Sequence, residues 1–312
     1  MTKCNNILSI LSIIIVLLLA AVTGGSFYML HVSLAPDPNR ADRDSCFQQL
    51  FRDYPETGPW IDSLMSCHAL RDTFVTMPTG ERHHAYYINR GVRKTALVIH
   101  GWRDQAIKYF CLALMYERDL GYNVVIPDLH AHGQSEGEAI DMGWQNRHDV
   151  KRWMQIFRQD TMVVHGVSMG AATTMMLSAE PMPAGIRDLR FVEDCGYTTV
   201  WDEFSDQMNK LFSLPPFPLM HTSSLLCHLR YGWHFSQASA LDAVRHCPYP
   251  MLFIHGDSDT FVPTAMVYRL YSAKPQPKAL WIAKDTDHAH SYLNHRAEYT
   301  RRVRQFLSVS IP

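Results

Sequence analysis

The chain has 312 residues, of which 47% are hydrophobic and 19% are charged, and its formal net charge is −1. This composition is sufficient for one large domain plus a terminal segment. The absence of a Lys/Arg block argues against a nucleic-acid partner, and the plentiful aromatic residues argue against disorder.

A long apolar run opens the chain. Residues 7–34 contain no Asp, Glu, Lys or Arg, and about 20 apolar residues suffice to cross a bilayer. Small residues around Gly24 and Gly25 leave signal-peptide cleavage open as an alternative, but the run continues through Phe27–Leu30. We therefore predict an uncleaved signal anchor, a transmembrane segment over residues 1–34.

The charges that flank this run do not fix its orientation. Lys3 precedes the run, and Arg40 and Arg43 follow it among acidic residues, which count for little in the positive-inside rule. The short basic start favours export. We predict a single-pass protein with its main domain on the extracytoplasmic side, either periplasmic or at the cell surface.

The seven cysteines form no C-x-x-C pair, so neither a zinc ribbon nor a thioredoxin-type motif is supported. Cys111 and Cys195 are interpreted as small buried hydrophobes. Cys46 and Cys67 flank a short segment and could pair if the domain is exported, although spacing does not determine connectivity. The odd number leaves at least one thiol unpaired within the chain.

Residues 35–72 are predicted to be a connector with a short helix, because residues 35–39 form a stop-and-turn cluster. The main domain then spans residues 73–312. Apolar runs predict eight strands in it: Thr73–Met77, Ala85–Asn89, Ala96–His100, Asn123–Pro127, Thr161–His165, Arg190–Glu193, Met251–His255 and Ala279–Ala283.

The last six of these strands are short, apolar and bounded by Gly, Pro or Asp, which is typical of buried parallel strands. Helical patterns fall between the strands, at Lys108–Leu120, Asn146–Gln159, Ala171–Ala179 and His295–Ser308. Strands that alternate with helices predict a doubly wound, mostly parallel α/β sheet.

Residues 201–247 break this alternation. The segment is apolar, is interrupted by Pro215, Pro216 and Pro218, and is too long for an ordinary loop. We predict a helical cap insertion that covers the active site. The alternative is a normal crossover helix with a long loop.

The segment Gly166-Val167-Ser168-Met169-Gly170 follows the predicted strand Thr161–His165 and precedes a predicted helix. This is the G-x-S-x-G nucleophile elbow in its strand–turn–helix context. The turn is sharp, so the residues that flank the serine must be small, as Gly166 and Gly170 are. The pattern predicts Ser168 as a nucleophile.

A serine hydroxyl needs a base, and the base needs an orienting carboxylate, in the chain order Ser, Asp, His. Asp259 follows a late predicted strand and His288 follows the last one. Both lie just beyond the carboxyl end of a strand, where α/β sheets place their sites. Asp194 as the acid and His290 as the base remain alternatives, whereas Asp257 is interpreted as a turn residue.

These motifs resemble the α/β-hydrolase superfamily over about residues 70–310, in particular bacterial membrane-anchored hydrolases of the serine aminopeptidase and Bem46-like branches. The family's G-x-x-D-x-x-V-P pattern matches Gly256, Asp259, Val262 and Pro263, and its late histidine matches His288. The resemblance implies the α/β-hydrolase fold and assigns the acid to Asp259.

The segment His100-Gly101-Trp102 matches the family's H-G-x motif, which implies oxyanion donors from the backbone N–H groups of Trp102 and Met169. Residues 128–137 resemble the family's D-x-R-G-H-G-x-S-x-G loop, but His130 and Ala131 replace the usual Arg and Gly, which puts any role for that Arg in doubt.

The pair His130 and His132 resembles half of a metal site, but no third ligand has suitable spacing, so we interpret it as part of a polar loop at the pocket rim. His83, His84 and His221 are interpreted as surface residues. No metal and no organic cofactor are predicted.

Together these features predict a serine hydrolase that forms an acyl-enzyme on Ser168 and cleaves an ester or amide carbonyl, as an esterase or peptidase does. Its substrate would be a small molecule or a peptide. One alternative is a catalytically inactive relative that serves as a binding or scaffold protein at the membrane. Another is a lipase-like enzyme that faces the cell interior and acts on membrane lipids.

Overall fold

The computed structural model describes residues 2–309, and the chain divides into two compact units. We call residues 1–35 and 200–237 the helical unit, and residues 36–199 and 238–312 the sheet unit.

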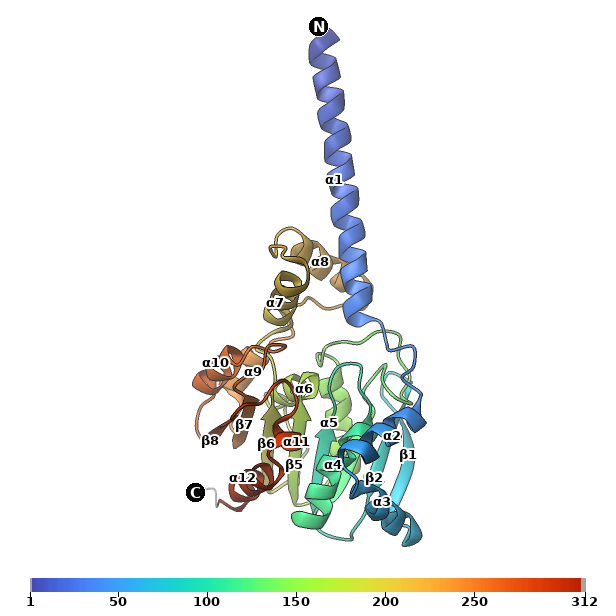
Figure 1. The fold of residues 1–312 in the computed structure, drawn as a ribbon, viewed down its shortest axis with the longest axis vertical. Helices are drawn as coiled ribbons and strands as arrows, with labels where there is room; N and C mark the ends of the chain where they lie inside the picture. Colours follow the sequence, from blue (N-terminus) through green and yellow to red (C-terminus); the bar gives the residue numbers. More distant parts are fainter. Residues whose placement is uncertain (1, 310–312) are drawn as a thin grey trace. The chain divides into compact units, whose positions relative to one another are not determined.

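An eight-stranded sheet forms the centre of the sheet unit (Figure 1). Its strand order is β1-β2-β4-β3-β5-β6-β7-β8. Strands β3 to β8 run parallel to one another, whereas β1 and β2 form an antiparallel edge. The strands are β1 (Leu70–Thr76), β2 (Arg82–Ile88), β3 (Lys94–Ile99), β4 (Asn123–Pro127), β5 (Thr161–Val167), β6 (Asp188–Asp194), β7 (Met251–Gly256) and β8 (Lys278–Ala283).

All eight strands predicted from the apolar runs are present, and the mostly parallel α/β-hydrolase fold is confirmed. The largest displacements are at β1 and β2, which begin at Leu70 and Arg82 instead of Thr73 and Ala85. Leu70 pairs with Ile88 and Arg71 with Tyr87 in the β1–β2 hairpin. The start of β1 is therefore set by its pairing with β2 and not by its own apolar pattern.

Two sets of helices pack against the sheet. Helices α2 (Arg43–Asp53), α3 (Thr57–Ser66), α4 (Phe110–Leu114) and α12 (Arg296–Ser308) share one apolar core with Val98, Val163 and Ile254. The second set packs on the sheet mainly through α6, with α10 against β7, and lies outside that cluster. It comprises α5 (Asn146–Ile156), α6 (Met169–Leu177), α9 (Ala240–His246) and α10 (Ala265–Ala273).

The predicted helix over Lys108–Leu120 is irregular. It consists of a 3₁₀ turn (Ala106–Tyr109), then α4, then a π-helical turn (Met115–Asp119) in which the Leu120 N–H donates to the Met115 carbonyl at 3.1 Å. Such wide turns place one extra residue in a helix and are common near functional sites. The apolar pattern predicted a helix here but not its changes of winding.

The connector is more ordered than predicted, because it contains two helices, α2 and α3, where one was expected. Asp42 caps α2 by accepting a hydrogen bond from the Ser45 N–H at 3.1 Å. Leu50, Ile61 and Leu64 are buried in the core, so this segment is part of the sheet unit.

The possible disulfide between Cys46 and Cys67 is absent, because both are free cysteines. The Cys46 sulfur instead accepts from the Gln105 amide at 2.9 Å, and Cys67 is exposed. Cys111 and Cys195 are buried, as predicted.

The helical unit comprises α1 (Thr2–Leu34), α7 (Val200–Phe212) and α8 (Leu219–Tyr231). Residues Ile7–Leu34 are long and apolar enough to cross a membrane, with a mean hydropathy of 2.8. Side chains 7–21 are exposed, whereas the buried Ser26 hydroxyl lies 3.5 Å from the Leu219 carbonyl of α8. The end of α1 therefore packs on α8. The covering role predicted for residues 201–247 remains a prediction.

Candidate active site

The predicted elbow lies between β5, which ends at Val167, and α6, which begins at Met169. Ser168 has φ 56° and ψ −119°, a region that a residue with a Cβ atom enters only at the cost of strain. A Cβ atom on Gly166 would lie 2.0 Å from the Gly170 carbonyl oxygen, and one on Gly170 would lie 2.2 Å from the Ile99 oxygen. Only glycine fits at either position.

The structure brings the three predicted catalytic side chains together. The Ser168 Oγ lies 2.8 Å from Nε2 of His288, and Nδ1 of the same ring lies 2.7 Å from Oδ2 of Asp259. An ionised carboxylate accepts only, so Nδ1 carries the proton that it donates to Asp259. Nε2 is then left to accept the serine proton, the tautomer that a general base needs.

Asp259 is held by several donors. Its Oδ1 accepts from the backbone N–H groups of Phe261 and Val262, both at 2.9 Å, and its Oδ2 also lies 3.2 Å from Nε2 of His255. Burial alone would raise the pKa of Asp259, but hydrogen bonds from His255 and His288 lower it to about 2. The carboxylate therefore stays ionised at neutral pH.

The contact with Val262 accounts for part of the G-x-x-D-x-x-V-P pattern, because the residue three positions after the Asp closes a turn around its carboxylate. His255 was missed in the sequence. Its position at the carboxyl end of β7 was the available signal.

The alternative acid, Asp194, faces other partners. Its carboxylate accepts from the hydroxyls of Tyr299 at 2.9 Å and Ser291 at 3.1 Å, and burial raises its pKa to about 6. Its backbone oxygen accepts from the Ser168 N–H at 2.8 Å. Asp194 thus braces the elbow.

The alternative base His290 and the predicted turn residue Asp257 each have a partner other than the serine. The alternative base His290 is exposed and pairs with Asp287 at 2.5 Å. Asp257 is an exposed turn residue whose carboxylate accepts from Ser258 at 2.9 Å.

The tyrosine beside Asp194 continues into a buried hydrogen-bonded chain that the sequence did not reveal. Tyr299 lies 2.8 Å from Nε2 of His165, whose Nδ1 lies 2.9 Å from the Tyr116 hydroxyl. Burial lowers the pKa of His165 to about 3, so its ring is neutral. This series of hydrogen bonds is buried and runs through His165 of β5, the strand that leads to the elbow.

The loop after β3 contains the predicted oxyanion donor Trp102. A Cβ atom on Gly101 would lie 3.4 Å from the Ser168 Cβ, so this backbone passes directly beside the serine. The Gly101 N–H donates to the Tyr109 hydroxyl at 2.9 Å, and that hydroxyl donates to Asp104 at 3.1 Å. The second predicted donor, Met169, is the first residue of α6, where N–H groups have no carbonyl partner within the helix.

The loop over residues 128–137 is packed more deeply than predicted. His132 was expected at a pocket rim but is 1% exposed. Its Nδ1 donates to the His130 carbonyl at 2.8 Å, which leaves its Nε2 to accept from the Arg103 N–H at 3.1 Å. Asp128 anchors the loop by accepting from the backbone N–H groups of Ala106 at 2.8 Å and Gln134 at 3.0 Å.

The prediction that His83 and His84 lie at the surface is wrong, because both are completely buried. They belong to β2, which pairs with β1 on one side and β4 on the other, so it is not an edge strand. His84 bridges Asp128 at 2.7 Å and Asp72 at 2.6 Å. His221 is exposed, as predicted.

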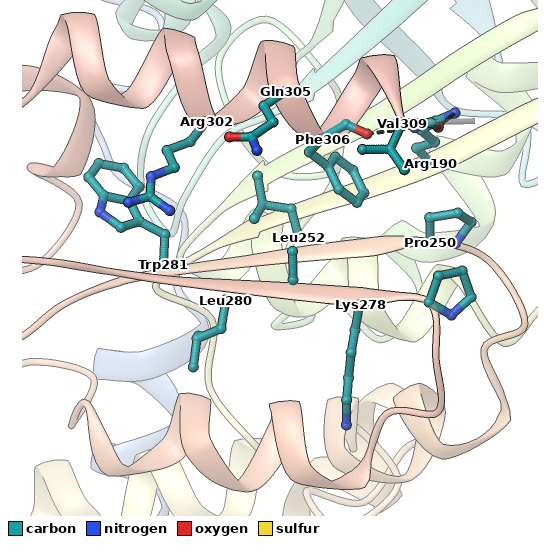
Figure 2. Close-up of a pocket in the computed structure, with 12 residues that line it drawn as sticks. Arg190, Pro250, Leu252, Lys278, Leu280, Trp281, Arg302, Gln305, Phe306 and Val309 are labelled. Atoms are coloured by element: carbon teal, nitrogen blue, oxygen red, sulfur yellow. Dashed lines mark hydrogen bonds between the residues drawn. The ribbon is translucent and has the colours of Figure 1, made fainter. Parts of the chain in front are cut away.

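Two cavities of the sheet unit differ in their relation to this site. One of about 200 Å³ is lined by Val167, Asp194, Tyr109 and His290, and so adjoins the elbow. The other, of about 290 Å³, lies between β8 and α12 near Lys278 and Phe306 (Figure 2). None of the predicted catalytic residues lines the second cavity.

The chain belongs to the alpha/beta hydrolase family, whose family model matches residues 96–302. Membership of this family supports a hydrolase function. The uncharacterised protein YqkD of Bacillus subtilis (strain 168) is 31% identical over 221 residues, which cover 68% of this chain and 70% of that protein. The branch within the superfamily remains a prediction.

Solved structures share the fold. The esterase Pf2001 of Pyrococcus furiosus superposes with a TM-score of 0.61 at 22% identity, over 76% of this chain and 91% of that one. A membrane phospholipase A, described as a bacterial virulence factor, superposes with a TM-score of 0.56 at 15% identity, over 82% of this chain and 92% of that one.

Proposed function

We propose that this chain is a serine hydrolase that cleaves an ester or amide carbonyl through an acyl-enzyme on Ser168. The observation that carries the proposal is the continuous hydrogen-bonded path from the Ser168 Oγ through His288 to Asp259, at 2.8 and 2.7 Å. An inactive binding relative would have no need for the serine, the base and the ionised acid to be aligned in this way.

In the first step, the Ser168 oxygen attacks the substrate carbonyl carbon while Nε2 of His288 takes the hydroxyl proton. Asp259 stabilises the charged imidazole that results. The imidazolium then protonates the leaving alcohol or amine as its bond to carbon breaks, and the acyl group remains on Ser168. Water, activated by the neutral His288, releases the acid and restores the serine.

Negative charge develops on the carbonyl oxygen in both tetrahedral states. The N–H groups of Trp102 and Met169 are the proposed donors to it, an effect worth about 3–4 kcal/mol per donor. The hydrogen bond from the Gly101 N–H to Tyr109 fixes the backbone just before Trp102. The donors therefore need little rearrangement during the reaction.

We also propose that α1 anchors the enzyme in a membrane, with the sheet unit on the extracytoplasmic side. The exposed apolar side chains of residues 7–21 support the anchor. External protease added to intact cells should then digest the sheet unit. A sheet unit that is digested only after the cells are lysed would place it inside and favour the lipase-like alternative.

The direct experiment is labelling of the detergent-solubilised full chain with an activated fluorophosphonate, followed by mapping of the modified peptide. Label on Ser168, absent from Ser168→Ala, is the expected result. A wild-type protein that labels no better than Ser168→Ala would overturn the proposed nucleophile and favour the inactive relative. Activated esters of varied chain length, tested against aminoacyl and peptidyl amides, would then separate esterase from peptidase activity.

A further inference from the structure

A second cluster of histidine and carboxylate lies in the sheet unit, where β2 begins beside the loop that follows β4. It consists of Glu81, His83 and His130. The ligand-type atoms of these three side chains all lie within 4.8 Å of one another. His83 and His130 face each other, with ring centroids 5.7 Å apart.

His83 is the unusual member of this cluster. Its side chain is 1% exposed, yet neither ring nitrogen makes a hydrogen bond to any residue that the structure describes. Nε2 lies 3.4 Å from Glu81, and Nδ1 lies 3.6 Å from Asp149. Buried polar groups almost always have a partner, because an unsatisfied one has lost its hydrogen bonds to water without replacement. The nitrogen that faces Glu81 and His130 therefore points to a partner that is not a protein atom.

The spacing of the three groups suits a small cation. Four ligands held about 2.1 Å from a tetrahedral zinc ion lie about 3.4 Å from one another. Oε2 of Glu81 lies 3.4 Å from Nε2 of His83 and 2.9 Å from Nδ1 of His130. Two imidazoles and one carboxylate form a ligand set that binds zinc in preference to magnesium or calcium.

We propose that Glu81, His83 and His130 bind a divalent transition-metal ion, with zinc as the best match, and that water completes the coordination. The inference does not depend on the serine mechanism. It also revises the expectation drawn from the His130/His132 pair. The partners of His130 are Glu81 and His83, at the start of β2 and far away in sequence, whereas His132 accepts from the Arg103 N–H.

The surroundings fit such a site. Histidines that bind metals usually donate their other ring N–H to a carboxylate, and Asp149 lies in that position beside Nδ1 of His83. Gly137, with φ +132°, leaves room for His130, because a Cβ atom there would lie 2.7 Å from Nδ1 of that ring. Glu136 is a further acidic group near His83.

The position of the cluster suggests what the ion would do. The backbone oxygen of His130 accepts from His132 at 2.8 Å, and His132 accepts from the Arg103 N–H at 3.1 Å. Arg103 directly follows Trp102, the proposed oxyanion donor. A bound ion would therefore stiffen the loop over residues 128–137, which supports that backbone, without touching the reacting atoms.

The test is a titration of the chelator-treated, detergent-solubilised full chain with Co²⁺, read by the visible absorption of four-coordinate cobalt, followed by displacement with Zn²⁺. We expect one equivalent in the wild type. His83→Gln and His130→Gln should each weaken binding at least about 100-fold, and Asp149→Asn about 10- to 100-fold.

Glu81→Gln removes a partly exposed ligand, so it tests the site without risk to the core. The chain has 17 histidines, and exposed His246→Gln serves as the matched control that should keep wild-type affinity. His288→Ala should also keep it, because His288 belongs to a different group of ligand types, Cys195, Asp259 and His288, which shares only Asp259 and His288 with the proposed triad. Wild-type binding no tighter than that of Glu81→Gln, or binding lost only in His288→Ala, would overturn the proposal.

Discussion

Two clusters of the sheet unit that join histidine to carboxylate, the one around His288 and the one around His83, differ in how their rings are paired. Both nitrogens of His288 have a partner, Asp259 on one side and the Ser168 hydroxyl on the other. Neither nitrogen of the buried His83 makes a hydrogen bond within the described chain. A ring between a carboxylate and a hydroxyl is arranged to move a proton, whereas a buried ring without a partner retains a lone pair for a ligand. The same type of side chain is thus proposed for two different roles, a general base at His288 and a metal ligand at His83.

The largest expected effect tests the first cluster. His288→Ala removes the proposed base, so kcat on an activated ester should fall about 10⁶-fold, as losses of a base in related triads do. The matched control is His290→Gln, which alters the neighbouring alternative base and should change kcat less than about threefold. If the two variants lost activity equally, the assignment of the base would be wrong.

The orienting acid should give the next largest effect. Asp259→Asn keeps the shape of the side chain but no longer fixes the ring tautomer, so kcat should fall about 10⁴-fold. Asp194→Asn, in the other candidate acid, should cost less than about tenfold because its carboxylate faces Tyr299 and Ser291. Steady-state kinetics of both variants on one ester would make the comparison. A larger loss of kcat in Asp194→Asn than in Asp259→Asn would assign the orienting acid to Asp194.

These two clusters were not equally predictable from the sequence. Ser168, Asp259 and His288 belong to short motifs that follow predicted strands, and parallel strands bring their carboxyl ends to one edge. Local pattern and fold class together were sufficient to predict their proximity. Strand position alone left Asp194 open as the acid, because both residues follow core strands. The G-x-x-D-x-x-V-P resemblance pointed to Asp259, and in the structure it is Asp259 that pairs with His288.

The cluster of Glu81, His83 and His130 could not be predicted from the sequence, because it depends on how β2 pairs with its neighbours. The sequence predicted a surface position for His83. Pairing of β2 with both β1 and β4 buries it. His130 reaches Glu81 across 49 residues, and no short motif encodes that contact. Non-local strand order decided this part of the site.

The next effect concerns Tyr109, whose hydroxyl accepts the hydrogen bond from Gly101 in the loop after β3. Tyr109→Phe leaves the buried Gly101 N–H without its acceptor, so stability should fall by about 1–3 kcal/mol. Because Gly101 precedes the proposed donor Trp102, kcat should also fall about tenfold, with KM little changed. Thermal unfolding and steady-state kinetics of the same preparation provide both numbers. If stability fell but kcat did not change, Tyr109 would have no role in positioning the oxyanion donors.

The smallest effect concerns the two carboxylates beside the elbow, whose pKa values shift in opposite directions. The pKa of Asp259 is lowered to about 2 by hydrogen bonds, so its contribution is present above about pH 4 and is lost as the pH falls toward 2. Burial raises the pKa of Asp194 to about 6. Between about pH 4 and 6 the folded state then binds more protons at Asp194 than the unfolded chain does.

The free energy of unfolding should therefore fall as the pH rises through that window, by at most about 3 kcal/mol from Asp194. Asp194→Asn cannot ionise, so the difference between the two proteins isolates this contribution from those of other buried acids. Thermal unfolding of both full chains from pH 4 to 7 measures it. We expect the stability gap to shift in favour of the variant up to about pH 6 and to be constant above. A gap that does not change with pH would mean that Asp194 is ionised throughout, and that its hydrogen bonds to Tyr299 and Ser291 outweigh its burial, as those of Asp259 do.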